Sequence, residues 1–231
     1  MTDSLRVVAL HRFPVKSMLG EPAADLALTE RGVDGDRVWS VRTADGKIGS
    51  GKNTRRFAAV PRLLELRGGV RSGTVVVGFP DGSWLPVDAA ETAERVSAFV
   101  GQPVTLARET EISHFDDGPV SLLGTASVAA VEAERGVEVD ARRFRANVLL
   151  ETTSAFVEES WVGRELRLGS ATLFVDMPSP RCVMVDMETA DLPEQHGNLL
   201  AVGRLNDARL GVIARVVSPG PVRVGDEAHI H

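Results

Sequence analysis

Cys182 is the only cysteine of the 231-residue sequence, so any thiol chemistry of the chain depends on this one side chain. A thiolate serves as a nucleophile or as a soft metal ligand, and a lone cysteine also occurs as a small buried apolar residue. One cysteine makes neither an intramolecular disulfide nor a cysteine-only zinc site. A Cys-His nucleophile would need a histidine brought to it by the fold. The residues alone leave these roles of Cys182 open.

Other residues that bind metals or cofactors are sparse. The histidines stand apart at positions 11, 114, 196, 229 and 231, and no HExxH, Walker or GxSxG motif occurs. A multi-histidine metal site is therefore not supported. Lysine occurs only at positions 16, 47 and 52, and only Lys16 has a suggestive place, at the end of the first predicted strand. A loop lysine at that position is weak evidence for a Schiff base, so pyridoxal phosphate binding is not supported either.

Composition and charge narrow the class of protein. Hydrophobic residues make up 43% and charged residues 25%, as in folded globular proteins. A net charge of -6 and a pI near 5.4 argue against binding to nucleic acid or anionic membranes. No run approaches the ~20 apolar residues of a membrane helix, and residues 1–10 lack a leader pattern. We expect a cytoplasmic, monomeric protein without nucleic-acid or membrane partners.

Alternating or β-branched segments between turn signals predict that strands dominate the fold. Ala44-Asp45-Gly46 and Pro80-Asp81-Gly82 carry the turn chemistry of hairpins. Asp88 can cap one helix at its start, and Gly101 suits its end. Helices are predicted at residues 89–100, 126–135 and 199–205, and the strands include residues 5–9, 37–43, 74–77, 104–108, 147–150, 171–176, 183–186, 211–217 and 223–230.

These elements predict a mainly β protein with a few short helices, of the α+β class. The polar stretch at residues 109–118 follows a predicted strand and has the composition of a linker. We therefore expect two domains, residues 1–108 and residues 109–231.

Five short motifs occur in an order and at a spacing that resemble the MOSC family, including its amidoxime-reducing members in mitochondria and their bacterial relatives. The motifs are Phe13-Pro14-Val15-Lys16-Ser17, Gly35-Asp36-Arg37-Val38-Trp39, Phe144-Arg145-Ala146-Asn147, Pro180-Arg181-Cys182 and Val224-Gly225-Asp226. The resemblance covers nearly the whole chain. It implies a MOSC N-terminal β-barrel domain packed on a β-rich MOSC domain.

The resemblance also implies a molybdenum cofactor, a molybdenum-pyranopterin dithiolene with a phosphate tail, for which Cys182 supplies the protein's sulfur ligand. A soft thiolate suits this metal, and Arg181 beside it favours the deprotonated form. Arginine and lysine suit the phosphate, and serine or asparagine suits the polar pterin edge. The implied cofactor-binding residues are Lys16, Ser17, Arg37, Thr125, Ser127, Arg145, Asn147 and Arg181.

The activity implied by the resemblance is reduction of N-hydroxylated or N-oxygenated small molecules, with Cys182 at the catalytic metal. A single cysteine cannot hold an iron-sulfur cluster, so we expect electrons from a separate donor protein. Lys52 is a candidate for substrate contact, and Asp186 is as readily structural as catalytic. The alternative is a non-catalytic protein that carries the cofactor or its sulfur.

Overall fold

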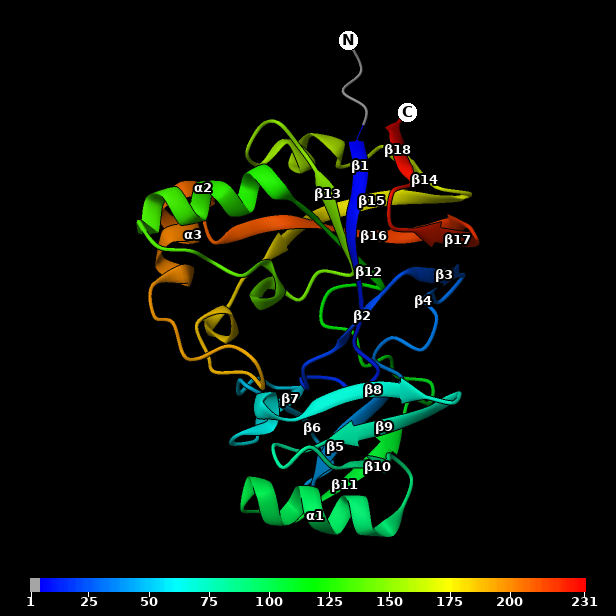
Figure 1. The fold of residues 1–231 in the computed structure, drawn as a ribbon, viewed down its shortest axis with the longest axis vertical. Coiled ribbons are helices and arrows are strands. Elements are labelled where there is room, and N and C mark those ends of the chain that lie inside the picture. Colours follow the sequence, from blue (N-terminus) through cyan, green and yellow to red (C-terminus); the bar gives the residue numbers. More distant parts are fainter. Residues whose placement is uncertain (1–4) are drawn as a thin grey trace.

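The strands of the protein gather in two bodies, a larger one above and a smaller one below in Figure 1. The computed structural model describes residues 5–231. Residues 1–4, which belong to the first predicted domain, lie outside the described part. The mainly β class with a few short helices is confirmed. In the described part of the chain, no helix is long and apolar enough to cross a membrane.

The larger body is built on an eight-stranded sheet with the order β13-β12-β16-β15-β14-β18-β1-β2. Because β13 also pairs with β1, seven of these strands close into a barrel. Only β12 and β13 run parallel, and the chain between them makes the long crossover that a parallel pair requires. The strands are β1 (Leu5–Arg12), β2 (Glu21–Ala23), β12 (Val120–Gly124), β13 (Val148–Glu151), β14 (Glu165–Leu168), β15 (Ala171–Pro180), β16 (Arg209–Ser218) and β18 (Glu227–Ile230).

Alternation of apolar and polar side chains fixes which face of each barrel strand is buried. In β1, Leu5 and Val7 are buried whereas Arg6 and Val8 point outward, as the two-residue period of a strand requires. The inward residues of all the barrel strands form one apolar core. A three-stranded sheet of β17 (Gly220–Arg223), β3 (Asp25–Thr29) and β4 (Gly32–Val33) extends this core.

Two helices, α2 (Thr125–Arg135) and α3 (Asn198–Asn206), lie together on one side of the barrel. They enclose a second apolar cluster that includes Val131 and Val202. Three short 3-10 helices belong to the connections of this body: η2 (Ala141–Phe144), η3 (Val157–Trp161) and η4 (Val183–Val185).

The smaller body combines two open sheets with α1 (Ala90–Val100), which packs at its far end. One sheet has the order β11-β5-β6-β7 and the other β10-β9-β8. Their strands are β5 (Trp39–Thr43), β6 (Ile48–Ser50), β7 (Phe57–Ala59), β8 (Arg67–Arg71), β9 (Thr74–Gly78), β10 (Trp84–Pro86) and β11 (Val104–Arg108), with η1 (Leu63–Glu65) between β7 and β8.

The three predicted helices and both predicted hairpins are confirmed. Gly101 ends α1 in the left-handed conformation, but its N-cap is Ala89 without a side-chain cap, in place of Asp88. The strand predicted at residues 183–186 was wrong, because the Val185 N–H turns back to the Cys182 carbonyl and forms η4. The strand predicted at residues 223–230 is interrupted by a turn at Gly225 that separates β17 from β18.

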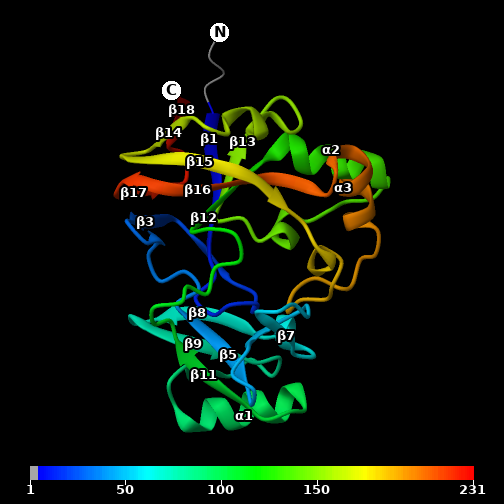
Figure 2. The same ribbon diagram turned by 180° about the vertical axis from the view of Figure 1, so that it is seen from behind.

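β1 and β2 come from the start of the chain but pair within the larger body, next to strands from the second half. Figure 2 shows the chain crossing between the two bodies from behind, with β15 and β16 side by side above. The boundary expected between residues 108 and 109 stays a prediction.

Candidate functional site

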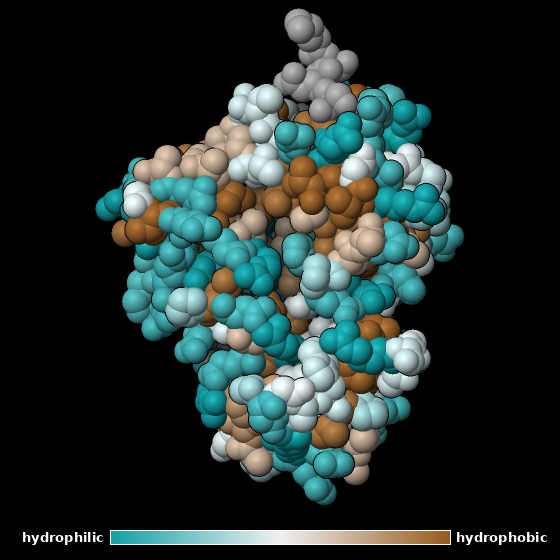
Figure 3. All heavy atoms as spheres, in the orientation of Figure 1, coloured by the Kyte–Doolittle hydropathy of each residue, from teal (hydrophilic) through white to brown (hydrophobic). Residues whose placement is uncertain are grey.

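A pocket formed by loops of both bodies contains Cys182. On the face seen in Figure 3, hydrophobic residues gather over the larger body and hydrophilic residues cover much of the junction between the bodies. The pocket wall is rich in cationic side chains and contains one thiol. Its lining residues are Arg37, Lys52, Asp116, Asp117, Gly118, Ser121, Arg143, Phe144, Arg145, Ser179, Pro180, Arg181, Cys182, Met184, Val185 and Ile213.

Cys182 lies just beyond the end of β15 and directly before η4. Its thiol is free and its side chain is partly exposed to the pocket. Its carbonyl accepts the Val185 N–H, at 3.2 Å. The turn into η4 therefore fixes the backbone of Cys182 while its sulfur remains without a covalent partner.

Arg181 is fixed by backbone carbonyls rather than by carboxylates. Its Nε donates to the Leu210 carbonyl at 2.8 Å, and its Nη1 donates to the Phe144 carbonyl at 2.8 Å. Burial lowers the pKa of Arg181 to about 10, and the charge of Cys182 acts in the opposite direction. A guanidinium with a pKa near 10 is still protonated at neutral pH, so Arg181 places a fixed positive charge beside the thiol.

Arg145 brings a second fixed cation to the pocket from the loop after η2. Its Nη1 donates to the Met18 carbonyl at 2.8 Å, and its guanidinium lies 4.5 Å from the Phe13 ring centroid. Burial and then the charge of Arg37 lower the pKa of Arg145 to about 10. The like charges of Arg37 and Arg145 are thus held close enough to oppose each other.

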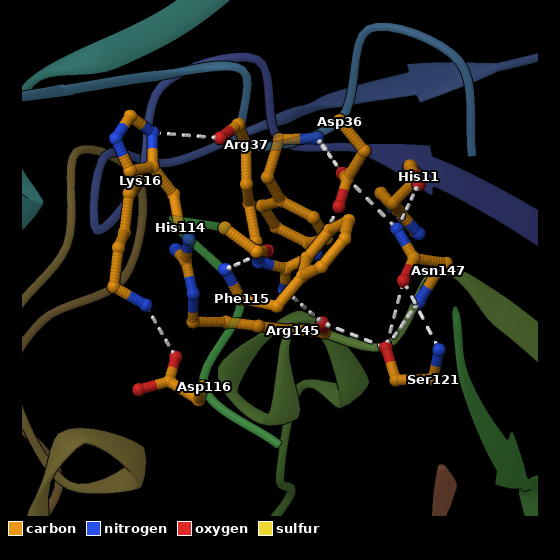
Figure 4. A network of polar contacts seen from close by, with 12 residues as sticks. His11, Lys16, Asp36, Arg37, His114, Phe115, Asp116, Ser121, Arg145 and Asn147 are labelled. Atoms are coloured by element: carbon orange, nitrogen blue, oxygen red, sulfur yellow. Dashed lines mark hydrogen bonds and ion pairs between the residues drawn. The ribbon is translucent and has the colours of Figure 1, made fainter. Parts of the chain in front are cut away.

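Arg37 stacks over the same ring, 4.9 Å from its centroid, and forms an ion pair with Asp36. Asp36 is fully buried, and its Oδ1 also accepts the Phe13 N–H and the Asn147 Nδ2–H. This buried carboxylate ties the loop before β5 to the barrel and compensates part of the positive charge (Figure 4).

Lys52 lines the pocket, whereas Lys16 reaches it only through Asp116, with which both lysines pair. The Lys16 Nζ is 2.7 Å from one oxygen of Asp116, and the Lys52 Nζ is 3.4 Å from the other. Lys16 is 2% exposed, and burial lowers its pKa to about 8 despite the attraction of Asp116. The two lysines in turn lower the pKa of Asp116 to about 2, although burial opposes this. Figure 4 shows Lys16 and Asp116 pointing toward each other.

Five expected cofactor residues do not line the pocket, Lys16 among them. The Ser17 hydroxyl donates to the Gly49 carbonyl, and that of Thr125 to the Thr152 carbonyl. The Ser127 hydroxyl donates to Glu158 and accepts the Phe156 N–H. The first free amides of α2 are also used, since the Ala126 N–H donates to the Thr152 hydroxyl.

Asn147 is buried and joins the barrel to the Arg37 loop. Its Oδ1 accepts the N–H and the hydroxyl of Ser121, and its Nδ2 donates to the His11 carbonyl and to Asp36 (Figure 4). Asp186 likewise has a structural arrangement, because its Oδ1 accepts the first amides of α3, from Asn198 and Leu199. All the expected site roles stay predictions: those of Lys16, Ser17, Arg37, Thr125, Ser127, Arg145, Asn147 and Arg181 in cofactor binding, and that of Cys182 as metal ligand.

Sequence reasoning missed several residues of the pocket. Asp116 and Asp117 belong to the polar stretch that was interpreted as a linker; the pair of acids before Gly118 is the only local signal. Arg143 was not separated from the other arginines. It is 4% exposed and lines the pocket, yet its Nε has no hydrogen-bond partner.

The side chains of the pocket fit a cofactor that carries negative charge and is bound through the sulfur of Cys182. The pocket offers cations from Arg37, Lys52 and Arg145, and a buried Arg143 N–H that lacks an acceptor. Within residues 5–231, no group of three or more His, Cys, Asp or Glu side chains could hold a metal ion. Among the described residues, these side chains therefore do not supply a complete ligand set for a metal at Cys182.

Comparison with known proteins identifies the family. The MOSC domain model matches residues 109–229, and the model of the MOSC N-terminal beta barrel domain matches residues 4–117. Together these matches cover almost the whole chain, and the chain belongs to the MOSC family.

Curated relatives of the chain include molybdenum cofactor sulfurases and an amidoxime reducing component. It is 25% identical over 238 residues to a molybdenum cofactor sulfurase of Drosophila melanogaster, covering 86% of this chain and 30% of the relative. It is 29% identical over 84 residues to mitochondrial amidoxime reducing component 2 of Bos taurus, covering 36% of this chain and 24% of the relative. The chain thus spans less than a third of the length of the relatives it matches.

Among solved structures, the YUAD protein from Bacillus subtilis has a similar fold. The TM-score is 0.55 at 14% identity, covering 100% of this chain and 97% of the other. At this identity the likeness concerns the fold alone.

Proposed function

We propose that the chain binds a molybdenum cofactor in the pocket, with Cys182 as the protein's sulfur ligand, and reduces N-hydroxylated or N-oxygenated small molecules. The observation that carries the proposal is the grouping of one free thiol with Arg37, Arg145 and Arg181 in one pocket. Thiolate suits molybdenum, and guanidinium groups suit phosphate. The relatives named above support the proposal, since one is a molybdenum cofactor sulfurase and the other an amidoxime reducing component.

In this proposal the bound cofactor supplies the two-electron chemistry that cleaves the N–O bond. The overall reaction takes an N-hydroxylated compound, two electrons and two protons to the amine or amidine and water. The chain's own residues bind and orient: Arg37, Arg145 and Lys52 hold negative charge, and Arg181 stabilises the thiolate. The electrons come from a separate donor protein. The monomeric state, the cytoplasmic location and the lack of nucleic-acid and membrane partners stay predictions.

The first test is the molybdenum content per purified chain. We expect Cys182→Ser to lose most of the metal, and Arg37→Ala to lose part of it. Arg215→Ala is the matched control, because Arg215 pairs with Asp176 outside the pocket. Equal metal content in wild type and Cys182→Ser would refute the ligand assignment.

The second test separates the enzyme from its alternative, a carrier of the cofactor or its sulfur, which the sulfurase relatives and the partly exposed thiol favour. With a reduced viologen as donor, molybdenum-loaded protein should consume an amidoxime or hydroxylamine. No turnover across a panel of such substrates, together with a persulfide on Cys182 in the mass spectrum, would favour the carrier.

A further inference from the structure

His114 is a fully buried histidine that does not line the pocket, yet it contacts the backbone of Arg37, which does. Its Nδ1 lies 3.0 Å from the backbone carbonyl of Arg37. Its Nε2 lies 2.9 Å from the Arg42 guanidinium and 3.1 Å from the Ser40 hydroxyl. The ring therefore bridges β5 and the loop that precedes it.

These partners select one form of the ring. A carbonyl oxygen only accepts a hydrogen bond, so Nδ1 must carry a proton; a guanidinium only donates, so Nε2 must be bare. The neutral Nδ1–H tautomer is the only form of His114 that satisfies both. Burial and the adjacent Arg42 also lower the pKa of His114 to about 4, so the ring is neutral at physiological pH.

The carbonyl held by His114 belongs to a residue in a rare conformation. Arg37 has a φ of 53°, in the left-handed region that a non-glycine residue enters at a cost of about 1 kcal/mol. Its N–H donates to the Phe13 carbonyl at 2.7 Å, so both peptide groups of Arg37 are fixed. This backbone conformation directs the guanidinium to the Phe13 ring and the pocket wall.

We propose that neutral His114 is a positioning residue, which holds the left-handed backbone of Arg37 and thereby sets the affinity of the pocket for phosphate groups. The inference rests on the proposed anion-binding role of Arg37. Besides Arg42, the charged groups near the ring are Lys16 and Glu109, whose carboxylate accepts the backbone N–H of His114. Glu109 offers only acceptors, Arg42 contacts the opposite edge of the ring at Nε2, and Lys16 donates to Asp116.

Two substitutions test the roles of the two ring nitrogens of His114 separately. The side-chain nitrogen of His114→Asn takes the place of Nδ1 and keeps the bond to Arg37, whereas His114→Gln keeps an acceptor near Nε2 for Arg42. Both variants lose one set of bonds and are expected to lose stability. Only His114→Gln should weaken binding of inorganic phosphate, by about tenfold, the worth of one misaligned charged hydrogen bond.

The measurement is calorimetric titration of inorganic phosphate into wild type, His114→Asn, His114→Gln, Arg37→Ala and the Arg37→Ala/His114→Gln double variant, with urea unfolding of each. In the Arg37→Ala background, His114→Gln should change phosphate affinity less than about twofold, because the effect acts through Arg37. Nitrogen-15 NMR of the histidine ring should report a protonated Nδ1 and a bare Nε2 at neutral pH.

Equal loss of affinity in His114→Asn and His114→Gln, in step with lost stability, would reduce His114 to a structural residue and overturn the proposal. Unchanged affinity in His114→Gln, or the other tautomer in the spectrum, would overturn it as well. Wild-type protein that binds no phosphate across the millimolar range would refute the anion site itself. That last result would count against the proposed function, whereas the others leave it standing.

Discussion

Acidification should destabilise the fold through His114 before it affects the ion pairs. The folded protein holds the pKa of this histidine at about 4, against 6.5 for a free side chain. Between these values the unfolded chain binds a proton that the folded chain does not, so stability falls as the pH drops from about 6.5 to 4 and levels off below. The shift corresponds to an upper limit of about 3 kcal/mol.

The assay is urea unfolding at a series of pH values, with His114→Asn as the control. This variant keeps the donor to Arg37 and has no titrating ring, so its stability should vary much less in this window. The pKa of His11 is also lowered, so His11 changes the stability with pH in the same direction. Because His11 is present in both proteins, its contribution cancels in the difference between their curves. Asp116, with a pKa of about 2, contributes below pH 3.8, outside the window. Parallel curves for the two proteins between pH 6.5 and 4 would refute the reasoning.

Three further substitutions test the polar network around the pocket. Asp116→Asn should cost about 2 kcal/mol of unfolding free energy, because it leaves the buried Lys16 ammonium without its counter-ion. Lys16→Met should cost under about 1 kcal/mol, because Asp116 still pairs with Lys52. Equal losses of the two variants in urea unfolding would contradict this asymmetry. Asn147→Ala should cost about 3 kcal/mol because it leaves Ser121, His11 and Asp36 groups unpaired inside the protein; a loss below about 1 kcal/mol would show that water or a shift replaces these bonds.

Local chemistry explains which elements were predictable. α1 and α2 end at Gly101 and Gly136, both left-handed, and the Gly46 and Gly82 turns close the two predicted hairpins. The barrel itself was not visible in local patterns. Its closure depends on pairing such as Val7 with Leu150, which lie far apart in the sequence and carry no mutual signal.

The site residues also fall into two groups, those that the sequence predicted and those whose contacts depend on the tertiary fold. Cys182, Arg37, Arg145 and Arg181 were expected together and lie in one pocket. Ser127 was expected to face an anion, but the fold brings the Glu158 carboxylate to its hydroxyl, and no sequence spacing predicts that contact. The same types of polar residue bind ligands and form hydrogen bonds with buried groups of the protein, so only the tertiary contacts tell the two roles apart.

The backbone conformation and the charges of Arg37 and Arg145 support the proposed anion-binding role of the pocket. Both are left-handed non-glycine residues, with φ of 53° and 52°, each costing about 1 kcal/mol. Both guanidinium groups lie against the Phe13 ring, so their like charges also repel. The buried Asp36 offsets part of this repulsion, and Asp116 adds a partly exposed negative charge. Strain and repulsion at one place support the proposed anion site, because a bound phosphate would relieve the part of the repulsion that Asp36 and Asp116 do not offset.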